Sequence, residues 1–243
     1  MIMQIKRMTA LCLLMVCAVS ALYAQTRNPI IRYFSRLLDE TRAELAIGEL
    51  ISGEMLREMT KKQPIVADAA LTKRMQQLSE SSSRPELQYH VYVVDSESID
   101  EIPFPGGYLI LTSGLMAKAD SPAKVDFILA RNQALIMMRQ PMKLIKKEGL
   151  YPSFLNYLKL PEAKKNKQDL RVYIRDYLRS LPKMDHRRAD IQGLLLTRSP
   201  EQTRKGAVQM LKELSDNIWP ATLWDSGELE QRIEMLENLI LPE

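Results

Sequence analysis

Residues 125–141, VDFILARNQALIMMRQP, constrain the fold more than any other part of this sequence. The stretch is predicted to be a helix, and apolar residues occupy nearly all of its faces, which is typical of a helix inside a core. Arg131, Asn132 and Gln133 nevertheless stand in its middle. A buried polar or charged side chain needs partners, so the fold is expected to supply them from elsewhere in the chain.

The first 24 residues have the composition of a secretory signal. Lys6 and Arg7 precede an apolar run, Met8–Ala24, that contains no acidic residue and is short for a membrane span. The small residue Ala24 suits cleavage. We therefore expect residues 1–24 to be removed on export to the periplasm or another exported location, leaving one domain at 25–243. The alternative is an uncleaved N-terminal anchor.

Both cysteines, Cys12 and Cys17, lie in this segment, so the mature chain is predicted to have no disulfide and no cysteine nucleophile. Without Lys6 and Arg7 the chain carries 32 basic and 30 acidic side chains, a net charge of +2, which does not indicate nucleic acid as a partner. Residues 131–212, however, hold 19 basic and 7 acidic side chains. They form either a solvated helical surface or a face for an anionic membrane or acidic partner.

The remaining pattern predicts the α+β class, mostly helix with one small sheet. Strands are predicted at 87–95, where LQYHVYVVD is rich in β-branched and aromatic residues, and at Tyr108–Thr112 after a Pro-Gly-Gly turn. Pro103 and Pro105 are expected to prevent regular pairing before that turn. Helices are predicted at about 30–60, 65–80, from Pro122 to a stop at Pro141, from about 164, and at about 184–198, 200–217 and 227–240.

Four motifs in this order resemble the HtpX, BepA and CAAX-prenyl-protease type of zinc metallopeptidase. ELAIGE at 44–49 is similar to the family's E-x-A-x-G, and DEIPFPGG at 100–107 to its N-A-F-A-x-P-G-G. TSGL at 112–115 resembles its T-x-G-L, and QRI at 231–233 its C-terminal R-I. The resemblance covers most of the mature chain and implies a zincin-like fold whose sheet packs on the active-site helix.

The family's zinc motif is changed at each functional position. Arg131 and Leu135 replace the two histidines of H-E-x-x-H, and Asn132 replaces its glutamate base. Arg131 is a cation, Leu135 has no donor atom, and Asn132 cannot accept a proton from water. In the family's E-x-x-A-D pattern, His186 replaces the third ligand and only Asp190 is kept.

These changes predict a catalytically inactive protein without a metal or another cofactor. No G-x-S-x-G elbow, phosphate loop or dinucleotide fingerprint indicates other chemistry. One alternative is an active hydrolase with a metal site rebuilt around His186 and Asp190. Another is a structural subunit that uses its basic face on a membrane or partner.

The resemblance also implies a partner for Arg131. In the resembled family an aspartate at the position of Asp190 orients the first zinc-binding histidine. Arg131 occupies the position of that histidine in this chain. We therefore expect an ion pair between Arg131 and Asp190 in the former metal site. The alternative is that Arg131 reaches solvent along its aliphatic stem.

By analogy with the resembled peptidases, an extended client polypeptide is expected to bind by strand addition along Tyr108–Thr112. Phe104 and Tyr108 would be its apolar anchors, and the competing expectation is that these side chains fill the core. The function expected is that of a binding, chaperone-like or assembly factor in the cell envelope. The predicted groove consists of Phe104, Gly106, Gly107, Tyr108, Ile110 and Thr112.

Overall fold

The computed structural model describes residues 29–79, 83, 84, 86–215 and 226–241. The predicted signal segment, 1–24, lies outside these residues. By its internal contacts the chain forms two compact units, Met1–Ala43 and Glu44–Glu243. The boundary between the units lies inside the first described helix, and the sheet belongs entirely to the second unit.

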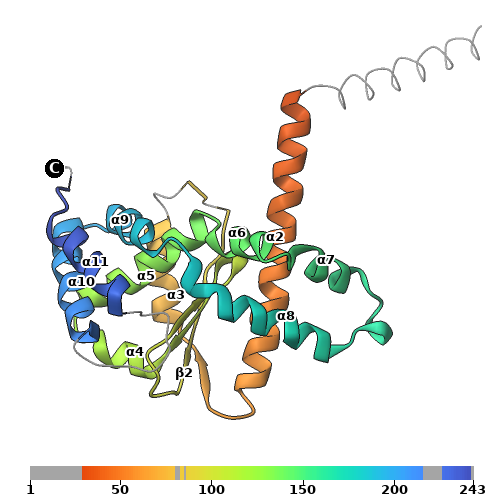
Figure 1. Ribbon diagram of the computed structural model, residues 1–243, viewed down its shortest axis with the longest axis horizontal. Coiled ribbons are helices and arrows are strands. Elements are labelled where there is room, and N and C mark those ends of the chain that lie inside the picture. The colour runs from red at the N-terminus through yellow and green to blue at the C-terminus, as the bar shows by residue number, and fades with distance from the viewer. Residues whose placement is uncertain (1–28, 80–82, 85, 216–225, 242–243) are drawn as a thin grey trace, which may run out of the picture. The chain divides into compact units, whose positions relative to one another are not determined.

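The described residues are mostly helical and contain one small mixed sheet, so the predicted helix-dominated α+β class is confirmed (Figure 1). The helices are α2 (Pro29–Met59), α3 (Ala69–Ser79), α4 (Ser113–Lys118), α5 (Pro122–Met137), α6 (Gln140–Lys147), α7 (Tyr151–Lys159), α8 (Lys167–Ser180), α9 (His186–Leu196), α10 (Pro200–Ser215) and α11 (Ser226–Glu237). The strands are β1 (Ile65–Ala67), β2 (His90–Val94), β3 (Glu101–Pro103) and β4 (Tyr108–Thr112). Short 3-10 turns span Pro105–Gly107, Glu162–Lys164 and Leu181–Lys183.

The four strands are arranged in the order β1-β2-β4-β3. β1 pairs antiparallel with β2, and β2 pairs parallel with β4, with His90 beside Tyr108. β3 then pairs antiparallel with β4, with Glu101 beside Leu111. β4 is therefore paired along both of its edges, whereas β1 and β3 lie at the two edges of the sheet.

Helices cover both faces of the sheet because each strand alternates its side chains between two apolar clusters. On one face, Val91 of β2 and Leu109 of β4 belong to a buried cluster with Phe127 of α5. On the other face, Ile110 of β4 belongs to a second cluster with Ile47 of α2. Helix α5 contributes residues to both clusters, so it packs against the sheet.

The Pro-Gly-Gly turn before β4 and its contact with α2 both depend on glycines. Gly106 and Gly107 have φ angles of 75° and 100°, in the left-handed region that residues with a Cβ disfavour. The turn also packs directly on α2, because a Cβ on Gly48 would lie 2.0 Å from the Pro105 carbonyl oxygen. The ELAIGE and PFPGG motifs are thus two sides of one close backbone contact.

Two local predictions at prolines are wrong. Pro103 belongs to β3 and pairs with Leu109, which is possible because β3 is an edge strand and a proline there gives up no ladder hydrogen bond. Pro141 does not stop α5, which ends at Met137; it lies in the first turn of α6, after Arg139 in a left-handed conformation with φ of 55°.

The predicted boundaries of two elements also differ from the structure. Residues 65–67 form β1 and not the start of a helix, and α3 begins only at Ala69. The strand predicted at 87–95 is shorter, at His90–Val94. Asp68 explains the first change, since its carboxylate accepts a hydrogen bond from the backbone N–H of Leu71 at 2.9 Å and so caps α3 at that point.

Candidate functional site

Helix α5 is buried on every side from Phe127 to Ile136. It begins at the predicted cap, Ser121, and packs against α3, α9, α10 and β3. The approach of α9 is close because a Cβ on Gly193 would lie 2.7 Å from the backbone nitrogen of Arg131. As a result Arg131 is only 1% exposed, and the alternative that it reaches solvent is wrong.

The Arg131 guanidinium has a different acceptor for each of its nitrogens. Its Nε donates to Oδ1 of Asp190 at 2.9 Å, so the predicted ion pair is confirmed. Its Nη2 lies 3.0 Å from Nδ1 of His186, and its Nη1 is ion-paired with the Glu101 carboxylate. Three elements, β3, α5 and α9, thus meet at one side chain.

Asp190 in turn binds two arginines. Arg232 of α11 donates from Nε to Oδ2 at 2.7 Å and from Nη2 to Oδ1 at 3.1 Å. This is the bidentate geometry that a guanidinium favours with a carboxylate. Burial would raise the pKa of Asp190, but the charges of Arg232 and Arg131 hold that pKa below its ordinary value. Asp190 is therefore an anion fixed between two cations.

We call Glu101, Arg131, Asp190 and Arg232 the buried ion cluster; each is at most 1% exposed. It contains two cations and two anions, so its net charge is zero. Charges removed from water are tolerated when they neutralise one another and are hydrogen-bonded. Burial and repulsion by Arg232 lower the pKa of Arg131 to about 10, against the attraction of Asp190, so Arg131 still carries its proton at neutral pH.

His186 joins this cluster as a neutral ring. A guanidinium can only donate, so Nδ1 accepts from Arg131 and the remaining Nε2–H faces the Leu181 carbonyl oxygen at 3.3 Å. Burial, followed by repulsion from Arg131 and Arg232, lowers the pKa of His186 to about 3. Both ring nitrogens are thus engaged within the protein.

The other polar positions of α5 have separate environments. Nδ2 of Asn132 donates to Oε2 of Glu101 at 2.6 Å and to the Ile128 carbonyl oxygen at 2.8 Å. Gln133 interacts with the Tyr89 hydroxyl. Burial raises the pKa of this hydroxyl to about 12, although the contact with Gln133 acts to lower it. Leu135, at the second histidine position, is fully buried in the apolar cluster that also contains Ile47 and Ile110.

The zinc ion implied by the resemblance does not fit these residues. Both oxygens of Asp190 accept from arginine, both nitrogens of His186 are engaged, and Leu135 lies among apolar side chains. Two guanidinium groups would also repel a divalent cation at this position. Among the side chains that the structure describes, no group of three or more His, Cys, Asp or Glu residues could hold a metal.

The prediction of a peptide groove along β4 is wrong, because it requires a free edge on that strand. A strand cannot add to β4, because β2 and β3 already pair with its two edges. Phe104 is fully buried and packs against Tyr177, with ring centroids 6.0 Å apart. Tyr108 is partly buried and stacks on His90, with centroids 4.9 Å apart. The remaining groove positions are all buried: Gly106, Gly107, Ile110 and Thr112.

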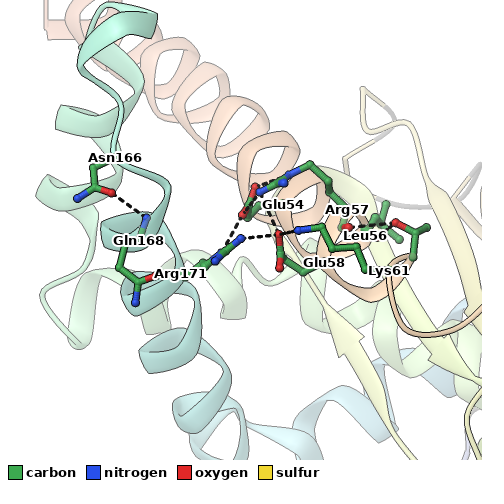
Figure 2. A network of polar contacts seen from close by, with 9 residues as sticks. Glu54, Leu56, Arg57, Glu58, Lys61, Asn166, Gln168 and Arg171 are labelled. Atoms are coloured by element: carbon green, nitrogen blue, oxygen red, sulfur yellow. Dashed lines mark hydrogen bonds and ion pairs between the residues drawn. The ribbon is translucent and has the colours of Figure 1, made fainter.

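Part of the basic charge between residues 131 and 212 is paired inside the second unit. Figure 2 shows one such network, in which Arg171 of α8 donates to Glu58 at 2.7 Å and lies 3.5 Å from Glu54. Arg57 pairs with both of these carboxylates, and Lys61 pairs with Glu58. The network joins α8 to the end of α2 and reduces the charge available to an anionic partner.

Sequence reasoning missed two members of the buried ion cluster, Glu101 and Arg232. Each lies in a motif that carried the resemblance, DEIPFPGG and QRI, but neither motif by itself assigns a partner. A usable signal was present in Arg131: a buried guanidinium has five N–H groups, and Asp190 alone cannot accept them all. The search for a second acceptor would have led to acidic residues in the matched motifs.

No protein-family model matches this chain, and a search of curated proteins finds no significant match. In the described part of the chain, no helix combines the length and the apolar character needed to cross a membrane. The interpretation of the site therefore depends on the sequence motifs and on the geometry of the buried ion cluster.

Proposed function

We propose that this chain is an exported, catalytically silent protein related to the HtpX-type zinc metallopeptidases. Its role is to bind extended polypeptide segments as a chaperone-like or assembly factor in the cell envelope. The export step depends on the composition of residues 1–24. The binding role is the one that a peptidase fold can keep, by analogy, after its catalytic residues have been replaced.

The proposal depends mainly on one observation: the residues at the positions of the peptidase zinc site lie together in the structure. Arg131 and Asp190 are 59 residues apart and come from the positions of a zinc-binding histidine and its orienting aspartate, yet they are in direct contact. His186, at the position of the third ligand, touches the same guanidinium. An unrelated helical protein would have no reason to bring these three positions together, so the contact supports the proposed relationship.

The chemistry of the cluster supports the absence of catalysis. Arg131 remains protonated at neutral pH, and Asp190 is an ionised carboxylate whose oxygens are occupied by arginine N–H groups. His186, with a pKa of about 3 and its lone pair directed at Arg131, is a poor general base. No side chain of this set is both free and suited to activate water.

The test is metal analysis of the purified full chain beside a peptidase assay on casein. We expect no bound zinc at stoichiometric level and no casein hydrolysis, because the ligands and the base are replaced. The same preparation should suppress the aggregation of reduced insulin chains, which measures binding without chemistry. A His186→Gln preparation made in parallel controls for a contaminating protease.

The opposite outcome is equally clear. About one zinc per chain, together with casein turnover that a chelator abolishes and that His186→Gln lacks, would establish the rebuilt metal site around His186 and Asp190. Failure to bind unfolded insulin chains would instead remove the chaperone-like role while leaving the conclusion on catalysis intact.

A further inference from the structure

In the part of the chain that the structure describes, one edge of the sheet, at β1, has no further strand beside it. Among the described residues β1 pairs with β2 alone, and the flanking hydrogen bonds of this pair join Asp95 N–H to Pro64 and Asp68 N–H to Val91, each at 3.0 Å. Backbone groups in an antiparallel ladder alternate between the two sides of a strand. The N–H and C=O groups of Ile65 and Ala67 must therefore point away from β2, toward the open edge.

The other edge of the sheet, β3, is already closed. The Tyr177 hydroxyl of α8 donates to the Pro103 carbonyl oxygen at 2.5 Å, and a proline has no N–H to offer. An added strand could not continue a ladder along these residues. If an extended polypeptide pairs with this sheet, β1 is the edge that can accept it.

An apolar hollow lies beside the open edge. It has a volume of about 410 Å³, and its walls include Val66, Leu71, Val93 and Met116. Val66 is 62% exposed, which is unusual for a β-branched residue in a strand. Val66 and Val93 are register partners, so their side chains lie on the same face of the sheet and line the same hollow.

The charge around the hollow selects the kind of segment that fits. Asp68 and Asp95 are among the eight residues that line it, and none of the eight is a lysine or arginine. A second copy of this chain, pairing antiparallel through its own β1, would bring a further Asp68 to this acidic rim. Basic residues on the incoming segment are therefore favoured over self-association.

We propose that β1 binds an extended polypeptide by strand addition, with one apolar side chain in the hollow and a basic residue next to Asp68 and Asp95. The partner class follows from the proposed function, whereas the site follows from the open edge. Ile65 and Ala67 would supply up to four backbone hydrogen bonds, and alternate side chains of the segment would lie on the Val66 face.

The proposal is tested with a fluorescein-labelled synthetic peptide of alternating valine and threonine, flanked by lysines, titrated with the full chain and followed by fluorescence anisotropy. Val66→Glu should weaken binding by roughly tenfold or more, about 1.4 kcal/mol. Ala67→Pro should do the same, because it removes an outward N–H without touching the pairing with β2. Leu195→Glu, at a position on α9 that is 45% exposed, is the matched control and should bind normally.

Each other outcome overturns a stated part of the idea. Binding that ignores Val66→Glu and Ala67→Pro would place the client elsewhere and refute the β1 site, even if insulin-chain aggregation is still suppressed. Equal binding of a peptide with glutamates in place of lysines would refute the charge preference. A change of oligomeric state in Val66→Glu, with unchanged peptide binding, would identify a second copy as the occupant. Failure of both peptide binding and aggregation suppression would remove the proposed function itself.

Discussion

Asp190 is the residue on which the charge balance of the interior depends. Its two oxygens accept three hydrogen bonds from Arg131 and Arg232. Without its charge, the two cations of the buried ion cluster would be left with one anion of that cluster, Glu101, which is paired with Arg131. An unpaired buried charge has a large desolvation cost. Removing one partner of a buried ion pair is therefore strongly destabilising, even where the complete pair adds little stability.

Asp190→Ala is therefore expected to destabilise the protein by about 3–5 kcal/mol. The double variant Asp190→Ala, Arg232→Met should lose less than the single variant, because it removes one cation together with one anion and leaves Arg131 paired with Glu101. Urea unfolding of the three proteins measures both differences.

Asp176→Ala is the control for this series. Asp176 is 42% exposed and lies 3.9 Å from Arg179, so its loss should change the free energy of unfolding by no more than about 0.5 kcal/mol. A double variant that is less stable than Asp190→Ala would contradict the charge-balance argument.

At the scale of elements, the contact between α2 and the turn before β4 is made by backbone atoms. Gly48→Ala would place a methyl group 2.0 Å from the Pro105 carbonyl oxygen, and neither element has a flexible side chain there that can yield. We expect a loss of about 1–3 kcal/mol, as for other overpacked sites, measured by thermal or urea unfolding.

Gly53 provides the matched control on the same helix. Nothing lies within 4 Å of a Cβ at this exposed position, so Gly53→Ala should stabilise the protein by up to about 1 kcal/mol through helix propensity. Equal effects of the two substitutions would mean that helix propensity, and not the contact with the turn, decides the outcome.

These elements also show how far the sequence can be interpreted. The 3.6-residue periodicity located α2, α5 and α8 to α11, since the type of a long periodic segment is clear from its pattern, whereas α6 and α7 were not predicted. The short edge strands could not be located in this way: β1 has only three residues, and β3 contains Pro103. The Arg131–Asp190 contact was implied by the resemblance, whereas the strands that pair with β4 depend on the register of the whole sheet.

At the scale of the whole molecule, the neutral His186 links stability to pH. Its folded-state pKa of about 3 lies below the unfolded value of about 6.5. Between these values the unfolded chain binds a proton that the folded chain excludes, so stability is lost as pH falls below about 6.5, by up to about 1.4 kcal/mol per pH unit. Asp190 adds a further loss once pH falls below its unfolded pKa, because its folded-state pKa is also lowered.

His186→Gln keeps one donor and one acceptor but cannot titrate. Urea unfolding between pH 7 and pH 4 should therefore show a distinctly shallower loss of stability in this variant than in the parent protein. Leu195→Gln, at an exposed position on the same helix, removes no titrating group and is the control that should follow the parent. A parent protein with a flat profile over this range would show that His186 is not kept neutral by its surroundings.

The sequence positions of the buried ion cluster have a consequence for the order of folding. A chain emerging from its N-terminus presents Glu101, Arg131 and Asp190 before Arg232, and the first three together carry one excess negative charge. The interior can close on a balanced set only after α11 has emerged, because domains complete their packing when all of their parts are present. Folding of this protein is thus finished by α11, and the export that we propose would act on a chain that is still open.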